Sequence, residues 1–236
     1  MKNQMLLTLA VFAATLFVSC RKNAEEIVAL LSDSEAAEIV ETAVAERSAG
    51  AAMPAVDMTK LVESWLENCG VPGDTTLQRA KTTGPVTYNY TFDMDWLVQC
   101  NNLNVPTAAT VDIAGNGSFS TQRWAGSDAT TGELSITGLN PQAPDYIVNG
   151  AYTLEGDVTG SLRNANPTLN CTTTLNLSDL AIRKSDRLIA GGTGTATVVV
   201  TNGKGRSETL NGALVFNGDG TVTVTVNGHT HTFPIQ

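Results

Sequence analysis

The stretch VTYNYTFDMDWLVQC, residues 86–100, decides the fold of this chain of 236 residues. Apolar side chains, several of them large and aromatic, occupy its even positions, which are Val86, Tyr88, Tyr90, Phe92, Met94, Trp96, Val98 and Cys100. Its odd positions are mostly polar. Because side chains of a β-strand point alternately to its two faces, this period of two predicts one long strand, or two strands joined by a bend, with one buried face.

The rest of the C-terminal part shows the same strand character. Of the 32 threonines in the chain, 28 lie from Thr75 onward, and glycine-containing turns recur about every 8–12 residues. Valines alternate with threonines over residues 221–226, and Asn227-Gly228 indicates a hairpin turn. We therefore predict a mainly β protein, built as an antiparallel meander, a sandwich or a curved sheet.

Three pairs of segments suggest an internal repeat. They are residues 114–120 and 191–197, 132–136 and 212–216, and 147–150 and 225–228, at offsets of 77, 80 and 78 residues. A near-constant offset predicts two related β units, at about 85–165 and 170–236. The two units could form two small sandwiches or one continuous curved sheet, and the sequence leaves both open.

The residues before the β-rich part favour short helices. Residues 24–46 are rich in Ala, Glu, Ile and Val, and residues 48–54 interrupt this pattern with Gly and Pro. A further helix is predicted over residues 57–68, with Gly70 as its C-terminal cap. Trp65 on this helix is predicted to anchor it in the core of the β body.

The first twenty residues resemble a lipoprotein signal. Residues 5–18 are mostly apolar, but this run is shorter than the ~20 residues that span a bilayer. It ends in Leu16-Phe17-Val18-Ser19-Cys20, which resembles the lipobox of bacterial lipoproteins, whose cysteine is acylated after cleavage. The resemblance implies a signal peptide at residues 1–19 and a lipid anchor at Cys20 that holds the protein to a membrane. A tether with short helices would follow at residues 20–55, and the β-rich body at residues 56–236.

A wider set of short motifs resembles lipoproteins of the Bacteroidota. The set is Asn68-Cys69-Gly70, Asp74-Thr75-Thr76, Cys100-Asn101, Val105-Pro106 and Val148-Asn149-Gly150, followed by a glycine-rich terminal hairpin pair. The resemblance implies a β fold and a place in the cell envelope, at the outer membrane, facing either the periplasm or the cell surface. It implies no active site. Asp74-Thr75-Thr76 also resembles the motif at which these bacteria O-glycosylate exported proteins, so Thr75 is a candidate acceptor, with a plain turn as the alternative.

Three cysteines remain if Cys20 is acylated, an odd number for an oxidising compartment. Cys69 follows the predicted helix, and Cys100 lies on the apolar face of the long strand. If that helix packs on that face, the two cysteines can meet, and their disulfide would stabilise the fold by about 3–4 kcal/mol. We predict the pair Cys69–Cys100 and a free, buried Cys171, with the two other pairings as alternatives.

The charge of the chain excludes one class of partner. It has 14 Lys and Arg against 23 Asp and Glu, a formal net charge of −9, whereas nucleic-acid binding needs clustered basic side chains. The sequence contains no Walker A loop, nucleophile elbow, His-Glu-X-X-His motif or Cys-X-X-Cys pair. We therefore expect no nucleic-acid partner, no cofactor and no metal.

Three groups of residues could carry chemistry or binding. His229 and His231 share a face of the last strand and could bind a metal with a third ligand, but we interpret them as the polar face of that strand. Asp93 and Asp95 share the polar face of the long strand and could serve a glycan hydrolase or bind Ca²⁺, but a solvated face is the simpler interpretation. Exposed aromatic side chains could form a binding surface, and the candidates are Trp124, Tyr146 and Tyr152.

These observations support three hypotheses of function. The first is a non-enzymatic lipoprotein of the cell envelope whose β body binds a protein or glycan partner. The second is a carrier that holds an apolar ligand in a curved sheet, which requires a cavity of about 300 Å³ or more. The third is a glycan-acting hydrolase that uses Asp93 and Asp95, and side chains isolated on an open convex face would count against it.

Overall fold

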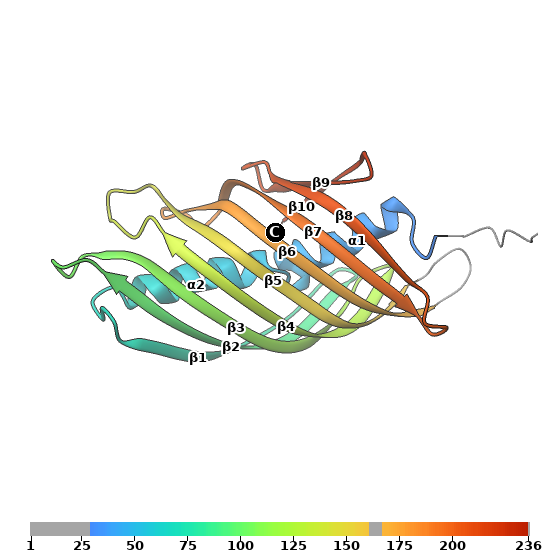
Figure 1. Cartoon of the computed structure of the whole chain (residues 1–236), viewed down its shortest axis with the longest axis horizontal. Coiled ribbons are helices and arrows are strands. Elements are labelled where there is room, and N and C mark those ends of the chain that lie inside the picture. The colour runs from blue at the N-terminus through green and yellow to red at the C-terminus, as the bar shows by residue number, and fades with distance from the viewer. Residues whose placement is uncertain (1–28, 161–166, 236) are drawn as a thin grey trace, which may run out of the picture.

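The computed structural model describes residues 29–160 and 167–235 and shows one open sheet of ten antiparallel strands (Figure 1). Each strand pairs with the strands before and after it in the chain, so the spatial order is the sequence order. The strands are β1 (Pro72–Thr83), β2 (Val86–Cys100), β3 (Pro106–Ser120), β4 (Trp124–Thr137), β5 (Asp145–Gly160), β6 (Thr168–Arg183), β7 (Ile189–Asn202), β8 (Ser207–Phe216), β9 (Thr221–Val226) and β10 (His229–Pro234).

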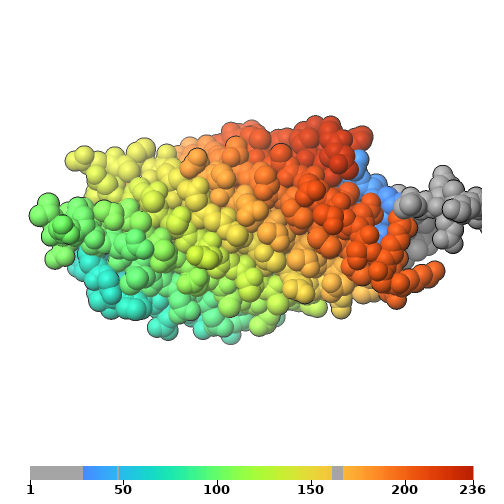
Figure 2. Space-filling view, in the orientation of Figure 1, coloured from blue at the N-terminus to red at the C-terminus, as the bar shows by residue number. Residues whose placement is uncertain are grey.

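Two helices and a short 3₁₀ turn precede the sheet and lie against its concave face (Figure 1). They are α1 (Asp33–Val44), η1 (Glu46–Ser48) and α2 (Ala52–Ser64). Pro54 stands in the first turn of α2, where its missing N–H would have no helical partner anyway. In the space-filling view the sheet covers most of the molecule, and the start of α1 shows only at the right margin (Figure 2).

The mainly β fold and the longest predicted strand are confirmed. β2 covers residues 86–100, and the sheet is continuous, so the alternative of two sandwiches is wrong. Two of the repeat pairs lie on corresponding strands, β3 with β7 and β4 with β8, whereas the third matches the start of β5 to the end of β9 and its turn. The sheet begins at Pro72, before the predicted start near residue 85, because β1 pairs with β2 along its whole length.

The second helix differs from the prediction in its bounds. α2 covers Ala52–Ser64 rather than residues 57–68, and Gly70, with a φ of 71°, lies in the turn before β1 instead of capping the helix. The role predicted for Trp65 is confirmed. Its ring packs edge-on against Trp96 of β2, with 5.9 Å between the ring centroids.

The segment predicted as a tether belongs partly to the folded domain. Leu31, Ile39 and Val40 are at most 4% exposed, and the N–H of Glu46 donates to the carbonyl of Ile235 at 2.7 Å. Small alanine side chains let the helices approach the sheet closely, so a face that looks thin in the sequence becomes core. The folded body therefore already includes Leu31 and does not begin at residue 56.

The middle and the C-terminal end of α2 are attached to the sheet by ion pairs. Asp57 pairs with Arg79 of β1 at 2.8 Å, and Glu63 pairs with Arg187 between β6 and β7. The helix therefore bridges from the β1 edge to the loop after β6, across the concave face.

Aromatic rings of the concave face lie over glycines of neighbouring strands. A Cβ atom would overlap the ring of Trp96 if placed on Gly73, the ring of Tyr90 on Gly117, and the ring of Trp124 on Gly160. A glycine inside a strand marks this kind of close approach. The rings therefore lie low on the sheet, which leaves room for the two helices above them.

Candidate functional site

A groove of about 610 Å³ runs between α1 and three parts of the sheet. Its walls come from α1 and η1, the start of β2, the turn between β3 and β4, and β10. The residues that line it are Glu38, Glu41, Thr42, Ser48, Pro85, Val86, Thr121, Gln122, Arg123, Trp124 and His231. Since ligand pockets of proteins typically measure about 300–1,000 Å³, this groove is the candidate functional site.

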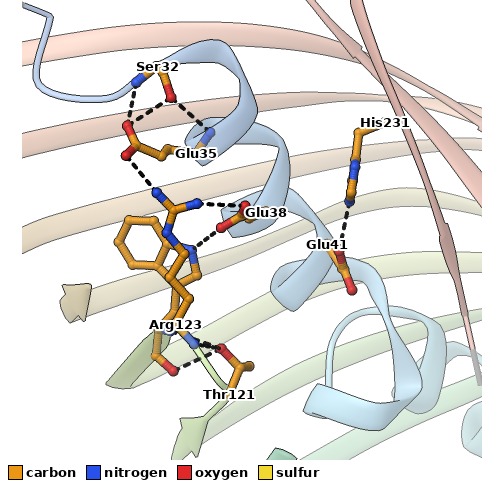
Figure 3. Close-up of polar contacts among 8 residues, drawn as sticks. Ser32, Glu35, Glu38, Glu41, Thr121, Arg123 and His231 are labelled. Carbon is orange, nitrogen blue, oxygen red and sulfur yellow. Dashed lines mark hydrogen bonds and ion pairs between the residues drawn. The ribbon is translucent and has the colours of Figure 1, made fainter. Parts of the chain in front are cut away.

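Arg123 attaches one wall of the groove to α1 (Figure 3). In the turn between β3 and β4, the Thr121 hydroxyl accepts hydrogen bonds from the backbone N–H groups of Arg123 and Trp124, at 3.3 and 2.9 Å. The Arg123 guanidinium donates to Glu35 and Glu38, each at 2.8 Å. The indole N–H of Trp124 donates to the other oxygen of Glu38 at 2.9 Å. These charge-assisted bonds hold both carboxylates in fixed orientations.

Glu35 connects this wall to the start of the helix. It is 4% exposed, and its carboxylate accepts hydrogen bonds from the backbone N–H of Ser32 at 2.7 Å and from the Ser32 hydroxyl at 2.9 Å. Glu35 is therefore both the capping-box residue of α1 and a partner of Arg123. Because a buried carboxylate is costly without such partners, the start of α1 and the turn of the sheet stabilise each other.

β10 forms the opposite wall, and both of its histidines face α1. His231 Nε2 lies 2.9 Å from Glu41 Oε2 (Figure 3), and His229 Nε2 lies 3.5 Å from Asp33. The prediction that the histidines share a face is confirmed, but this face also carries the buried Phe233 and is in register with the buried valines of β9, so it is not the polar face of the strand. Among the described residues, no group of three or more His, Cys, Asp or Glu side chains is arranged to hold a metal ion.

The fixed charges make this groove negative. Of the charged side chains described around it, the carboxylates of Glu35, Glu38 and Glu41 stand against the guanidinium of Arg123, which leaves a balance of −2 while His231 is neutral. The side chains of Glu38 and Glu41 are 26% and 17% exposed, so a ligand can reach them. A cleft with a net charge of one sign concentrates ligands of the opposite sign.

A second polar cluster lies deeper, on the concave face of the sheet beneath α1. Asp128 of β4 accepts a hydrogen bond from the Tyr90 hydroxyl at 2.6 Å and another from the Thr130 hydroxyl at 3.4 Å. Its cross-strand neighbours are Gly117 and Gly156, and the ring of Tyr90 lies over Gly117 beside the carboxylate. Burial raises the pKa of Asp128 to about 6, although the hydrogen bonds from Tyr90 and Thr130 lower it.

A small cavity separates this cluster from the helix. It measures about 30 Å³ and is lined by Asp128 and Cys171 on the sheet side and by Ile39, Thr42 and Ala43 of α1 on the other. This volume suffices for one or two water molecules. Cys171 is the free, buried cysteine that the sequence predicted, and burial raises the pKa of its thiol.

The prediction of an aromatic binding surface is wrong, because Trp124, Tyr146 and Tyr152 are core residues. They are 2%, 1% and 1% exposed. All three occupy inward positions of β4 and β5, and charged groups cover the ring of Tyr146. Lys184 Nζ and the Arg187 guanidinium lie 4.7 and 5.1 Å from its centroid. These rings stabilise the sheet and offer no stacking platform to a ligand.

Asp93 and Asp95 lie exposed on the convex face of β2. Asp93 accepts a hydrogen bond of 2.6 Å from Thr76. Asp95 belongs to a row of directly opposed carboxylates across four strands, which holds Asp74, Asp95, Asp112 and Glu133. An open convex position gives no support to the sheltered acid–base pair that a glycosidase needs.

Three further predictions have different outcomes. The disulfide between Cys69 and Cys100 is confirmed. Thr75 lies within β1, so the alternative of a plain turn is wrong, while its use as a glycosylation acceptor stays a prediction. Cys20 lies outside the described residues, and its lipid anchor also stays a prediction.

The residues of the groove itself were not predicted from the sequence. Arg123 stands 85 residues from Glu38 and 88 from Glu35, so no local pattern connects them. For Asp128 a signal did exist, because it shares the even, inward register of Trp124 and Thr130 along β4. An acidic residue at an inward position indicates a buried polar cluster.

The fold and the groove define the class: an antiparallel sheet of ten strands that wraps two helices and carries an acidic groove beside the first of them. Comparisons of the chain with protein-family models, with curated proteins and with solved structures found no match. Within residues 29–160 and 167–235, no helix combines the length and the apolar character needed to cross a membrane. Function is therefore argued from the chemistry of the groove.

Proposed function

We propose that this protein is a non-catalytic binding protein of the bacterial cell envelope, anchored by a lipid on Cys20, and that its groove binds a cationic segment of a partner protein. The observation that carries the proposal is the negative groove with its fixed carboxylates. Glu38 and Glu41 stand one helical turn apart on the same side of α1, where a Lys or Arg side chain could contact both.

The other walls of the groove suit such a segment. Pro85 and Val86 offer an apolar surface to the aliphatic stem of a lysine, whose ammonium group stays near the carboxylates. Hydroxyl and amide groups of Thr42, Thr121 and Gln122 can pair with a peptide backbone. Because Arg123 and His231 already hold the carboxylates in place, binding would order few further side chains.

A tetralysine peptide is the probe for this groove. We expect it to bind the full chain in isothermal titration calorimetry, and we expect Glu38→Gln with Glu41→Gln to weaken binding by about tenfold, equivalent to about 1.4 kcal/mol. The matched control is Asp95→Asn with Asp112→Asn, which removes two charges from the convex face and should change affinity by less than about twofold. Equal weakening by both double variants, or no binding of tetralysine by the wild type, would reject the groove as the site.

The lipid anchor has its own test. Cys20→Ala should move the protein from the membrane fraction to the soluble fraction of its native host, because acyl chains provide stable attachment and a protein without them has none. Protease treatment and antibody labelling of intact cells then show whether the wild type faces the surface or the periplasm. A Cys20→Ala variant that remains in the membrane fraction would exclude lipidation at this residue as the anchor.

The two other hypotheses of function receive less support. The helices fill the concave face, and the cavity beneath α1 measures about 30 Å³, far below the several hundred needed by an apolar ligand. The carboxylates considered for a hydrolase lie in the open on the convex face. The groove beside α1 therefore remains the best candidate for binding.

A further inference from the structure

The cavity between α1 and the sheet contains an acidic group that has few hydrogen-bond donors. Asp128 has two donors among the described side chains, the hydroxyls of Tyr90 and Thr130. The part of α1 above it adds none, since the hydroxyl of Thr42 already donates to the carbonyl of Ile39 at 2.7 Å. A buried ionised carboxylate is stabilised by several hydrogen-bond donors or by a nearby cation. Asp128 has only the two hydroxyl donors and no cation among its described neighbours.

The groups facing Asp128 are titratable only as weak acids. They are Tyr90 on β2, Tyr152 on β5 and Cys171 on β6, and the α1 residues lining the cavity are Ile39, Thr42 and Ala43. None of these described neighbours is a cation. The Tyr152 hydroxyl is buried and makes no hydrogen bond to the described residues. Water in the cavity is therefore the available way to solvate the charge.

We propose that Asp128 is an ionisation switch for α1: the protonated carboxyl group keeps the helix docked on the sheet, and the carboxylate draws water into the cavity and loosens the helix. The groove shares Thr42 of α1 with this cavity, so a loosened helix changes the shape of the groove. The switch does not depend on what the groove binds, because its readout is the docking of α1 itself.

The direction of the pH dependence follows from the docked state. Burial in the docked structure raises the pKa of Asp128 from 3.8 to about 6, so the docked state holds its proton more tightly than a state in which the group is exposed. The protonated Asp128 therefore contributes most to the stability of the docked helix below about pH 4. This contribution is lost as the pH rises toward and past 6. From these two values the open population should rise about tenfold between pH 5 and pH 8.

Cys171 reports this opening, because it lies in the same cavity and becomes accessible only when α1 moves. The experiment uses the full chain with Cys20→Ala, in which Cys171 is the free thiol, and measures its rate of labelling by a maleimide from pH 5 to pH 8. The same chain with Asp128→Asn is the control, since it has the same thiol without the titrating carboxyl group. We divide the labelling rate of the chain with Asp128 by that of the chain with Asp128→Asn, and we expect this ratio to rise about tenfold from pH 5 to pH 8.

Thiolate formation does not imitate this result. It speeds labelling in both chains, and the Asp128 charge raises the pKa of Cys171 and so slows the wild type. Hydrogen exchange gives a second measurement: relative to the chain with Asp128→Asn, in which His229 and His231 still contact α1, the amides of residues 33–44 in the chain with Asp128 should exchange about tenfold faster at pH 8 than at pH 5. Those of β7 (Ile189–Asn202), in the middle of the sheet, should not change. The switch would be overturned if the ratio of labelling rates stayed constant from pH 5 to pH 8. It would also be overturned if the exchange rate of α1, relative to that in the chain with Asp128→Asn, did not change over this range.

Discussion

Replacement of both Cys69 and Cys100 by Ala is expected to lower the free energy of unfolding by about 3–4 kcal/mol. The disulfide joins residues 31 apart in the chain, and the loss of this cross-link increases the conformational entropy of the unfolded chain by the cost of closing such a loop. The bond also connects the segment after α2 to the end of β2, next to the edge-on contact of Trp65 with Trp96. Urea unfolding followed by circular dichroism measures the change.

A reductant provides the internal control for this prediction. Dithiothreitol should lower the stability of the wild type by the same amount and leave the double variant unchanged. A single Cys171→Ala variant, which alters a buried thiol but no cross-link, should keep its sensitivity to the reductant. A loss of less than about 1 kcal/mol in the double variant would mean that the segment around Cys69 is already ordered in the unfolded chain.

The strands were predictable because their signal is local. Every second residue of β2 from Tyr88 to Val98 is buried in the structure, and the same residues are large apolar ones in the sequence. The disulfide followed from the same alternation, since Cys100 falls on the apolar face, onto which a helix with a C-terminal Cys69 could pack. Both inferences needed only one strand and one helix, with no knowledge of which strands are neighbours.

The place of the aromatic residues could have been inferred but was not. Trp124 shares its even register with Leu134 and Ile136 of the same strand, and Tyr152 shares its register with Leu154. This parity places them on the inner face of the sheet. What the sequence does not show is that a glycine of the next strand makes space for the rings of Trp124 and Tyr152, because cross-strand register depends on distant parts of the chain.

The groove was beyond sequence analysis for the same reason. Glu38 and Glu41 look like ordinary polar residues of an exposed helix, and Arg123 looks like an ordinary turn residue. These residues form one site only because the sheet is curved. The curvature brings the turn after β3 and the last strand to opposite sides of one helix. Because of the same curvature, the described part of the segment predicted as a tether packs into the core of the domain.

Substitution of Gly156 by Ala is expected to destabilise the protein by about 3 kcal/mol, at the upper end of what overpacking costs. A Cβ atom at this position would overlap the carbonyl oxygen of Ser127 and would lie 2.6 Å from Cα of Asp128. These atoms belong to the backbone of β4, so no side-chain rotation can relieve the clash. The two strands must separate where Asp128 receives its hydrogen bond from Tyr90, and the polar cluster beneath α1 should lose its geometry as well.

Gly203→Ala is the matched control, because a Cβ atom there would meet no atom within 4 Å. It should change the free energy of unfolding by no more than about 0.5 kcal/mol. Urea unfolding of the two variants compares them directly, and faster labelling of Cys171 in Gly156→Ala at pH 5 would show that the spacing of β4 and β5 also controls the docking of α1. A loss below about 1 kcal/mol in Gly156→Ala would mean that the sheet can widen at little cost. The glycines of the inner face would then be dispensable for its curvature.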